Sequence, residues 1–281
     1  MSERFAIVTD SAADMGALAQ ANGVDVVPLT IRFGNQEYRD GVDLSSTEFY
    51  AKLETSPQPP ITAQPAPAAF VETYRRLLDA GAERILSLHI SAALSGTFNA
   101  ASIGASMVDA RRISVIDTRC VSAGIAMLAI DARHRFTEGA SFDDVEKAIR
   151  ADLPHVQLFA TVPSLTYLAR GGRIGGVRGL VGNVLKIVPI LTLKDGAVSE
   201  HTKVRTFTRA VDQLVQTAID RMPDKARARI AILHSVAPEL AASISERLRI
   251  ATEPVSEITC DIGPTVGTHA GPGAVGVCFI P

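Results

Sequence analysis

Apolar and polar positions along the first half of the chain alternate with two periods, one of two residues and one close to that of a helix. The short apolar runs predict strands at residues 5–8, 24–33, 84–90 and 113–117. Helical spacing of apolar positions predicts helices at residues 15–21, 46–53, 70–78, 97–107, 123–135 and 142–153. Strands that alternate with helices in this way are typical of a parallel, doubly wound sheet.

The second half has a different pattern, in which a hairpin stands among helices. Apolar runs at residues 188–193 and 197–204 flank Lys194-Asp195-Gly196, and an Asp-Gly pair favours a tight hairpin turn. Further strands are predicted at residues 156–162, 229–236 and within 257–279, and helices at 163–169, 206–222 and 238–251. We therefore predict a two-domain α/β protein, with a Rossmann-like domain at residues 1–155 and an α+β domain at residues 156–281.

Polar turns follow three of the predicted parallel strands, at Asp10-Ser11, at residues 91–97 and at residues 117–122. The carboxyl ends of parallel strands share one edge of a sheet, where ligands bind in doubly wound folds. The second turn joins Ser95, Gly96 and Thr97 to a following helix, and such a turn suits a carboxylate or phosphate. The alternative is that Ser95 or Thr97 only caps the helix, and these residues alone favour the cap.

A proline-rich segment at residues 55–68 separates two predicted helices. Prolines there prevent a helix or a central strand, and a long loop within a compact domain is either functional or disordered. The embedded Ile61 and Thr62 favour an ordered, functional loop. Before it, Ser45 and Glu48 have the spacing of a helix capping box, which we interpret as structural.

The composition is that of a globular protein with a substantial core. The chain has 281 residues, of which 47% are hydrophobic and 21% charged, with a net charge of −2 and no Trp. This balance argues against nucleic acid and anionic membrane surfaces as partners. No apolar run approaches the ~20 residues that span a bilayer, and no signal-peptide pattern begins the chain, so the expected location is the cytoplasm. The odd, widely spaced Cys120, Cys260 and Cys278 fit buried thiols in a reducing compartment.

The histidines and glycines do not form a recognisable metal or nucleotide motif. Six histidines are scattered without metal-ligand spacing, and His89 lies in an apolar strand, where a core role is favoured. His269 lies in a predicted loop of small residues, where structural and functional interpretations are equally supported. Residues 271–276 match GxGxxG, but the helix and downstream acid of a dinucleotide site do not follow, so no such cofactor is expected.

Two further constellations leave alternatives open. Ser95 and His269 could form the nucleophile and base of a hydrolase, but no Gly-x-Ser-x-Gly elbow surrounds Ser95 and no acid is obviously placed to orient His269. Arg170, Arg173 and Arg178 lie among glycines, either as a solvated loop or as a site for phosphate or a partner.

Taken together, these segments resemble the DegV family, the fatty-acid-binding subunits of bacterial fatty acid kinase. The resemblance covers essentially the whole chain in order. It rests on Asp10-Ser11, Ile61-Thr62-Ala63-Gln64-Pro65-Ala66-Pro67, Leu94-Ser95-Gly96-Thr97, Asp117-Thr118 with Ser122, residues 167–174, Pro189-Ile190-Leu191, Lys203-Val204-Arg205 and residues 267–273.

The resemblance implies a two-domain fold that holds one long-chain fatty acid, with its acyl chain in an apolar tunnel and its carboxylate at the domain junction. The family's carboxylate ligands map to Thr62, Ser95 and His269. Two hydroxyls, an imidazole and the backbone N–H groups of Gly96 and Thr97 can saturate a carboxylate.

The resemblance also implies that a separate ATP-dependent kinase phosphorylates the bound carboxylate. The chain would then be a non-catalytic subunit without a cofactor. Arg170, Arg173 and Arg205 look like the family's basic face for docking that kinase.

The chain departs from the family pattern in two places. The proline-rich loop of the family often has serines where this chain has Ala63 and Ala66, which removes two hydroxyls. The family also often has Lys directly before Pro-Ile-Leu, whereas here Val188 takes that position and the nearest lysine is Lys186.

Overall fold

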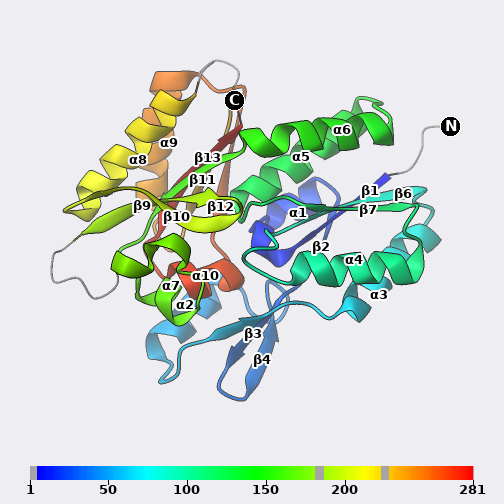
Figure 1. The fold of residues 1–281 in the computed structure, drawn as a ribbon, viewed down its shortest axis with the longest axis horizontal. Helices are drawn as coiled ribbons and strands as arrows, with labels where there is room; N and C mark the ends of the chain where they lie inside the picture. The colour runs from blue at the N-terminus through cyan, green and yellow to red at the C-terminus, as the bar shows by residue number, and fades with distance from the viewer. Residues whose placement is uncertain (1–4, 181–186, 223–227, 281) are drawn as a thin grey trace.

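The computed structural model describes residues 5–180, 187–222 and 228–280. Two sheets stand side by side, and a smaller three-stranded sheet lies beneath them (Figure 1). Lys186 lies outside the described residues.

The first sheet has four parallel strands in the order β2-β1-β6-β7, which are β1 (Phe5–Asp10), β2 (Val24–Val27), β6 (Arg84–His89) and β7 (Ile113–Asp117). The helices that accompany this sheet are α1 (Ala17–Ala21), α3 (Pro67–Asp79), α4 (Thr97–Val108), α5 (Ala123–Thr137) and α6 (Phe142–Asp152). Alternate residues of the strands enter different cores, since Val8 packs with α3 and α4 whereas Ile7 packs with α5. Helices therefore cover both faces, which confirms the predicted α/β class with a doubly wound parallel sheet.

The single strand predicted over residues 24–33 is wrong. It is two strands, β2 and β3 (Thr30–Phe33), which belong to different sheets. Pro28 lies at the break, and because proline has no N–H to donate, it ends the parallel ladder there. β3 pairs antiparallel with β4 (Gln36–Arg39) and with β5 (Ile61–Ala63), an edge strand within the proline-rich loop.

The helix between β4 and β5 begins as the sequence predicts. Ser45 accepts a hydrogen bond from the backbone N–H of Glu48, and the Glu48 carboxylate accepts one from the backbone of Ser45. This capping box opens α2 (Ser46–Thr55). By contrast, Ala66 stands at the N-cap of α3 without a side-chain cap, so the alanine at this position removes a cap that a serine would supply.

The second sheet has six strands in the order β10-β9-β8-β13-β11-β12. The predicted hairpin is present, with positive φ at Asp195 (52°) and Gly196 (78°), as a tight two-residue turn requires. The strands are β8 (Gln157–Thr161), β9 (Val188–Lys194), β10 (Ala197–Val204), β11 (Arg229–His234), β12 (Ser256–Asp261) and β13 (Val275–Ile280). Only the β11–β12 pair is parallel, so this part of the chain is of mixed α+β type.

Helices α8 (Phe207–Arg221) and α9 (Pro238–Thr252) cover one face of the second sheet and share its core (Figure 1). The opposite face meets α5 and residues that line an apolar cavity between the two halves of the chain. Two short helices, α7 (Thr166–Arg170) and α10 (Pro264–Ala270), complete this half, together with a 3-10 turn at Gly175–Leu180. Two further 3-10 turns, at Ser11–Ala13 and Leu153–His155, lie in the N-terminal half. α10 packs against α2 of the N-terminal half, so contacts cross the boundary between residues 155 and 156. The division into two domains at this point stays a prediction.

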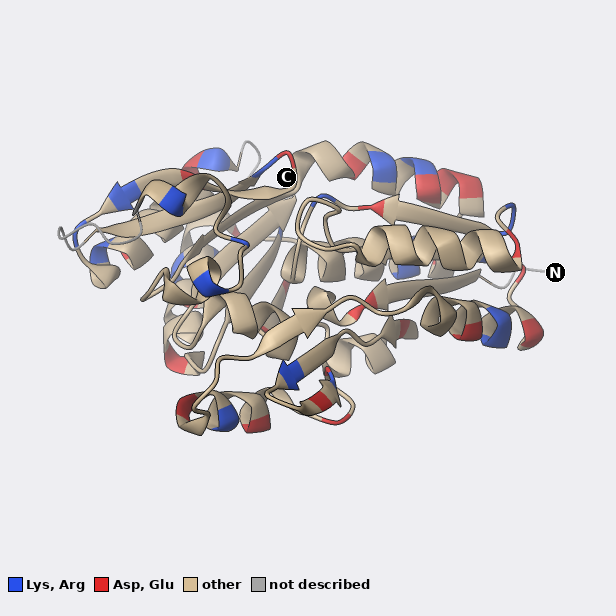
Figure 2. Ribbon diagram, turned by 60° about the horizontal axis from the view of Figure 1, so that its bottom comes forward, with Lys and Arg blue, Asp and Glu red and all other residues tan. Residues whose placement is uncertain are grey.

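Acidic and basic positions are interspersed over several outer elements and do not form one continuous face (Figure 2). Within the described ranges, no helix is long and apolar enough to cross a membrane. All three cysteines are buried with free thiols.

Candidate site at the junction of the two sheets

A cavity of about 400 Å³ lies where the two halves of the chain meet. Its walls are mainly aliphatic side chains, contributed from the N-terminal half by residues such as Leu29, Ile90 and Val121 and from the second sheet by residues such as Leu158 and Leu191. Pockets of this size and apolar character typically hold small organic ligands, with a few polar groups that fix the orientation.

Thr62, Ser95 and His269 all line this cavity. Thr62 comes from β5, Ser95 from the turn before α4, and His269 from α10. The Thr62 Oγ1 and His269 Nε2 atoms lie 3.0 Å apart and are hydrogen-bonded, although 207 residues separate them in the chain. The tertiary structure therefore brings the three predicted carboxylate ligands to one cavity.

His269 is not in a loop, as the sequence predicts, but on the last turn of α10. Its Nδ1 atom is buried without a hydrogen-bond partner in the described structure and faces Gly171. Burial and, to a smaller extent, the positive charge of Arg173 lower the pKa of His269 to about 4. The imidazole is therefore neutral near pH 7.

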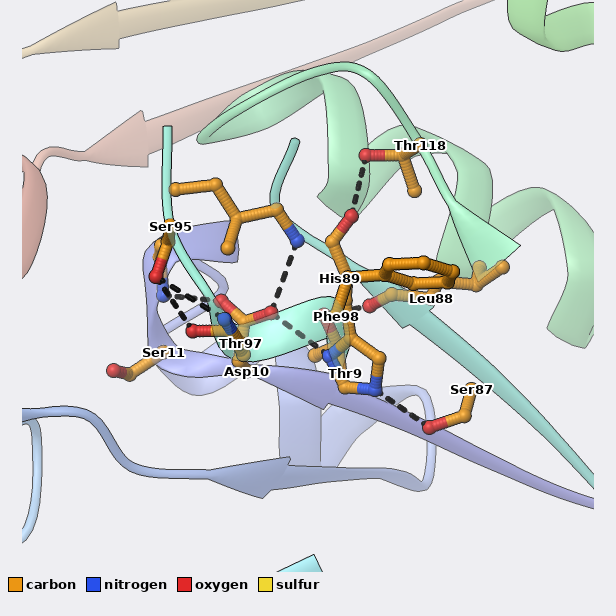
Figure 3. Close-up of polar contacts among 12 residues, drawn as sticks. Thr9, Asp10, Ser11, Ser87, Leu88, His89, Ser95, Thr97, Phe98 and Thr118 are labelled. Atoms are coloured by element: carbon orange, nitrogen blue, oxygen red, sulfur yellow. Dashed lines mark hydrogen bonds and ion pairs between the residues drawn. The ribbon is translucent and has the colours of Figure 1, made fainter. Parts of the chain in front are cut away.

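The turn that carries Ser95 is held by a buried chain of polar contacts (Figure 3). At the end of β1, Asp10 Oδ2 accepts a hydrogen bond from the Ile90 N–H (3.0 Å) and lies 2.8 Å from His89 Nδ1. His89 Nε2 in turn lies 2.7 Å from Ser87 Oγ. His89 has no exposed surface, which confirms its predicted role in the core, and the contacts fix where the strand ends and the turn begins.

Within that turn, Ser95 Oγ accepts a hydrogen bond from the Thr97 N–H (3.3 Å) and lies 2.8 Å from Thr97 Oγ1 (Figure 3). Gly96 packs against Gln64, since a Cβ at position 96 would lie 1.9 Å from the Gln64 side-chain oxygen. Gly96 and Thr97 are not among the described residues that line the cavity; Gly96 borders a neighbouring one of about 330 Å³. Their role as backbone donors to a ligand stays a prediction.

The three predicted docking arginines are exposed but do not form one patch. Arg173 donates to the carbonyls of Leu94 (3.1 Å) and Gly171 (2.9 Å) and lines both cavities beside Ser95. Arg170 ends α7 close by. Arg205 follows the far end of β10, roughly 25 Å along the strand at ~3.3 Å per residue.

One feature of the site is not visible in the sequence. The sequence leaves Arg173 in a solvated loop or in a site for phosphate or a partner, whereas in the structure Arg173 lines the cavity and its charge reaches His269. This placement has no local sequence signal, because it depends on contacts between segments far apart in the chain, such as the bond from Arg173 to the carbonyl of Leu94. The departure at Val188 lies beside Val204, next to Arg205, at the far end of β10, through the pairing of β9 with β10.

The geometry does not supply a hydrolytic triad. Ser95 bonds to Thr97 and His269 bonds to Thr62, and no carboxylate in the described part of the chain accepts from His269. Among the same residues, no group of three or more His, Cys, Asp or Glu side chains could hold a metal ion. The arrangement instead offers hydroxyl and imidazole groups beside an apolar cavity, which suits a molecule with one acidic end and a long apolar tail.

Burial should make His269 and Asp40 change stability with pH in opposite directions. Burial raises the pKa of Asp40 from 3.8 to about 6, so this carboxyl stabilises the fold below pH 4 and loses that effect as the pH rises through 6. The lowered pKa of His269, from 6.5 to about 4, adds stability above pH 6.5 that disappears as the pH falls through 4.

We therefore expect Asp40→Asn to gain stability relative to the wild type between pH 4 and 7, by on the order of 2 kcal/mol. His269→Gln should lose a similar amount relative to the wild type over the same range. Urea unfolding of delipidated protein at several pH values measures both differences. Differences that stay constant with pH would contradict the burial of these two groups.

Comparisons with known proteins match over the whole chain. A family model described as an uncharacterised protein of the DegV family matches residues 4–281. A DegV domain-containing protein of Streptomyces coelicolor is 35% identical over 279 residues, covering 99% of this chain and 98% of that protein. Among solved structures, this chain is similar to a DegV family protein of Thermus thermophilus described by its fatty acid binding, with 31% identity, a TM-score of 0.91 and 99% of each chain covered. It is also similar to a stearic-acid-binding protein of Eubacterium ventriosum, with 25% identity, a TM-score of 0.90 and 98% of each chain covered.

Proposed function

The chain belongs to the DegV family, and on that premise we propose that it binds a long-chain fatty acid in the cavity at the junction of its two sheets. The observation that carries this proposal is the convergence of Thr62, Ser95 and His269 on one aliphatic cavity. Relatives of similar fold are described as fatty acid binding, which supports the same ligand class here.

The physical division of labour in such a site is simple. Each methylene of the tail that leaves water contributes up to ~0.8 kcal/mol, so the aliphatic walls supply most of the affinity. Hydrogen bonds from Thr62, Ser95 and His269 to the carboxylate fix which end of the ligand lies at the turn before α4. Arg173 lies close enough to add positive charge to that end of the site.

We further propose that the protein presents the carboxylate to a separate ATP-dependent fatty acid kinase and does not itself catalyse a reaction. The absence of an acid beside His269 in the described structure supports a binding role over hydrolysis. Arg170 and Arg173, which lie next to the carboxylate end, are the proposed docking residues, with Arg205 as a second contact further along β10. Three free, buried thiols fit the proposed cytoplasmic location.

Native mass spectrometry of purified protein, followed by lipid extraction, tests the binding proposal. We expect an adduct with the mass of a long-chain fatty acid, or uptake of one by delipidated protein. Protein that neither carries nor takes up a fatty acid would contradict it. The kinase proposal is tested by adding a bacterial fatty acid kinase and ATP and trapping the acyl phosphate with hydroxylamine.

Gly171 gives a prediction specific to the carboxylate end. A Cβ at this position would lie 2.0 Å from His269 Nδ1, so Gly171→Ala must displace the imidazole from Thr62. We expect fatty acid affinity to fall about tenfold, the cost of one charge-assisted hydrogen bond. Gly176→Ala is the matched control, because its Cβ would make only ordinary contact, at 3.6 Å from Ser199. Equal affinities of the two variants would argue against His269 as a ligand.

A further inference from the structure

The start of α10 is held by three buried side chains of the N-terminal half of the chain. Asp14 Oδ1 accepts a hydrogen bond from the Gly263 N–H (2.9 Å), and Asp40 Oδ2 accepts one from the Thr265 N–H (3.1 Å). The Tyr50 hydroxyl donates to the carbonyl of Ile262 (3.0 Å). Asp14 and Asp40 are separated from their partners by 249 and 225 residues, so the contacts join distant parts of the fold.

Close packing at two glycines restricts the position of α10 against these side chains. A Cβ at Gly267 would lie 2.5 Å from the Tyr50 hydroxyl and 2.9 Å from the Phe49 ring. A Cβ at Gly263 would lie 3.1 Å from Asp14 Oδ1. His269 follows Gly263 by six residues, or about 9 Å along the helix at 1.5 Å per residue. Because the helix is short and closely packed, a shift at its start moves His269 as well.

The two carboxyls lie outside the cavity that we propose for the fatty acid. Neither is among the described residues that line the cavity, and Asp14 and Asp40 are 6% and 4% exposed. The Ser122 hydroxyl faces Asp14, and those of Ser11 and Thr265 face Asp40. Asp10 acts on both carboxyls through its charge, and burial together with the nearby charges of the two carboxyls raises the pKa of Tyr50. Burial and the charges of Asp14 and Asp261 also raise the pKa of Cys260.

A backbone N–H needs only a neutral acceptor, whereas a buried carboxyl without a basic partner carries a desolvation cost. Burial accordingly raises the pKa of both Asp14 and Asp40. Two buried carboxyls bond to backbone N–H groups at the start of the same helix, at Gly263 and Thr265. This arrangement indicates that a fixed position of α10 is worth the cost of burying both groups.

We propose that Asp14 and Asp40 are positioning residues, which hold the start of α10 and thereby set His269 against Thr62 in the carboxylate site. This inference rests on the proposed binding of a fatty acid. It assigns to two acids outside the cavity a role in how the site recognises the acidic end of its ligand.

The test compares an acid with an alcohol of the same tail. Equilibrium binding of radiolabelled hexadecanoic acid and hexadecanol is measured on delipidated full-length wild type, Asp14→Ala and Asp40→Ala. We expect each alanine variant to lose about tenfold in affinity for the acid and less than twofold for the alcohol. Asp43→Asn, an exposed acid three residues from Asp40, should bind both ligands like the wild type.

A double variant shows whether the effect passes through the imidazole. In the His269→Gln background, Asp40→Ala should cause no further loss of acid affinity, since the group that it positions is already absent. Asp14→Asn and Asp40→Asn keep an acceptor oxygen, so they should restore acid affinity to within threefold of the wild type. The ¹³C carboxyl shift of bound [1-¹³C]hexadecanoic acid should follow the same order. If the alanine variants fail to fold, Gly263→Ala takes their place, because its Cβ would lie 3.1 Å from Asp14 Oδ1, and it should show the same selective loss of affinity for the acid.

Four results would overturn the inference. Alanine variants that bind the acid like the wild type would show that the carboxyls do not position the site. Equal losses for acid and alcohol, or additive losses with His269→Gln, would show a general effect on the fold. A wild type that binds neither ligand would instead overturn the proposed function itself, together with this inference.

Discussion

Replacing Ala160 with tryptophan will abolish the binding of hexadecanoic acid while leaving the protein folded. Ala160 lies on β8, where Leu158 and Ala160 line the cavity and Phe159 points into the core under α8. An indole at position 160 would fill a large part of a cavity of about 400 Å³.

The expected loss follows from the tail. Excluding roughly half of its methylenes, at ~0.8 kcal/mol each, lowers the affinity about ten thousandfold. Octanoic acid, whose tail needs less space, should lose much less. Equilibrium binding of both acids to delipidated protein measures the change, with circular dichroism to confirm folding.

Ala51→Trp is the matched control, because it adds the same side chain on the exposed surface of α2, outside the cavity. It should bind both acids like the wild type. Tight binding of hexadecanoic acid by Ala160→Trp would mean that the acyl chain lies somewhere other than this cavity.

Replacing His269 with leucine will lower fatty acid affinity by about two orders of magnitude. The leucine removes the imidazole next to Thr62 and leaves a buried carboxylate with one donor fewer. A hydrogen bond to a charged group is worth about 1.5–3 kcal/mol, and a buried charge that stays unpaired adds to the loss. Ser95→Ala should have a smaller effect of the same sign, because the Ser95 hydroxyl is shared with Thr97.

Binding of hexadecanol separates this effect from damage to the cavity, since an alcohol does not need the full set of donors. His134→Leu, an exposed histidine on α5, is the control and should leave both affinities unchanged. Unchanged acid binding by His269→Leu would remove His269 from the site. Labelling of Ser95 by a serine-reactive fluorophosphonate would instead favour the hydrolase alternative.

Local patterns in the sequence predict most of the secondary structure correctly. The capping box at Ser45 and the hairpin turn at Asp195-Gly196 depend on residues only a few positions apart, and both are present. The alternation of strands and helices predicts the parallel sheet, and the loops at its carboxyl edge meet as expected, with the Thr118 N–H and hydroxyl bonded to the carbonyl of His89.

The two wrong predictions of secondary structure have different causes. In one a single residue interrupts an apolar pattern, and in the other a contact with a distant segment accompanies a structure that the local pattern does not predict. Pro28 divides an apolar run that reads as one strand, and the second piece leaves for another sheet. His269 lies among small residues that suggest a loop, yet residues 264–270 form a helix, in which Gly267 packs closely against Tyr50 and Phe49. Small side chains allow close approach, but the sequence does not show what they approach.

The sequence by itself therefore determines the elements, their order and, through its resemblance to a family, the three side chains expected around a carboxylate. Only the tertiary structure decides that Thr62 and His269 meet across 207 residues, that Arg173 lines the same cavity, and that Asp14 and Asp40 hold the helix of His269 from outside it. The physical reason is the separation along the chain over which each interaction acts. Periodicity and capping act over a few residues of one segment, whereas a buried carboxyl finds its partner N–H only after the two halves of the chain have packed together.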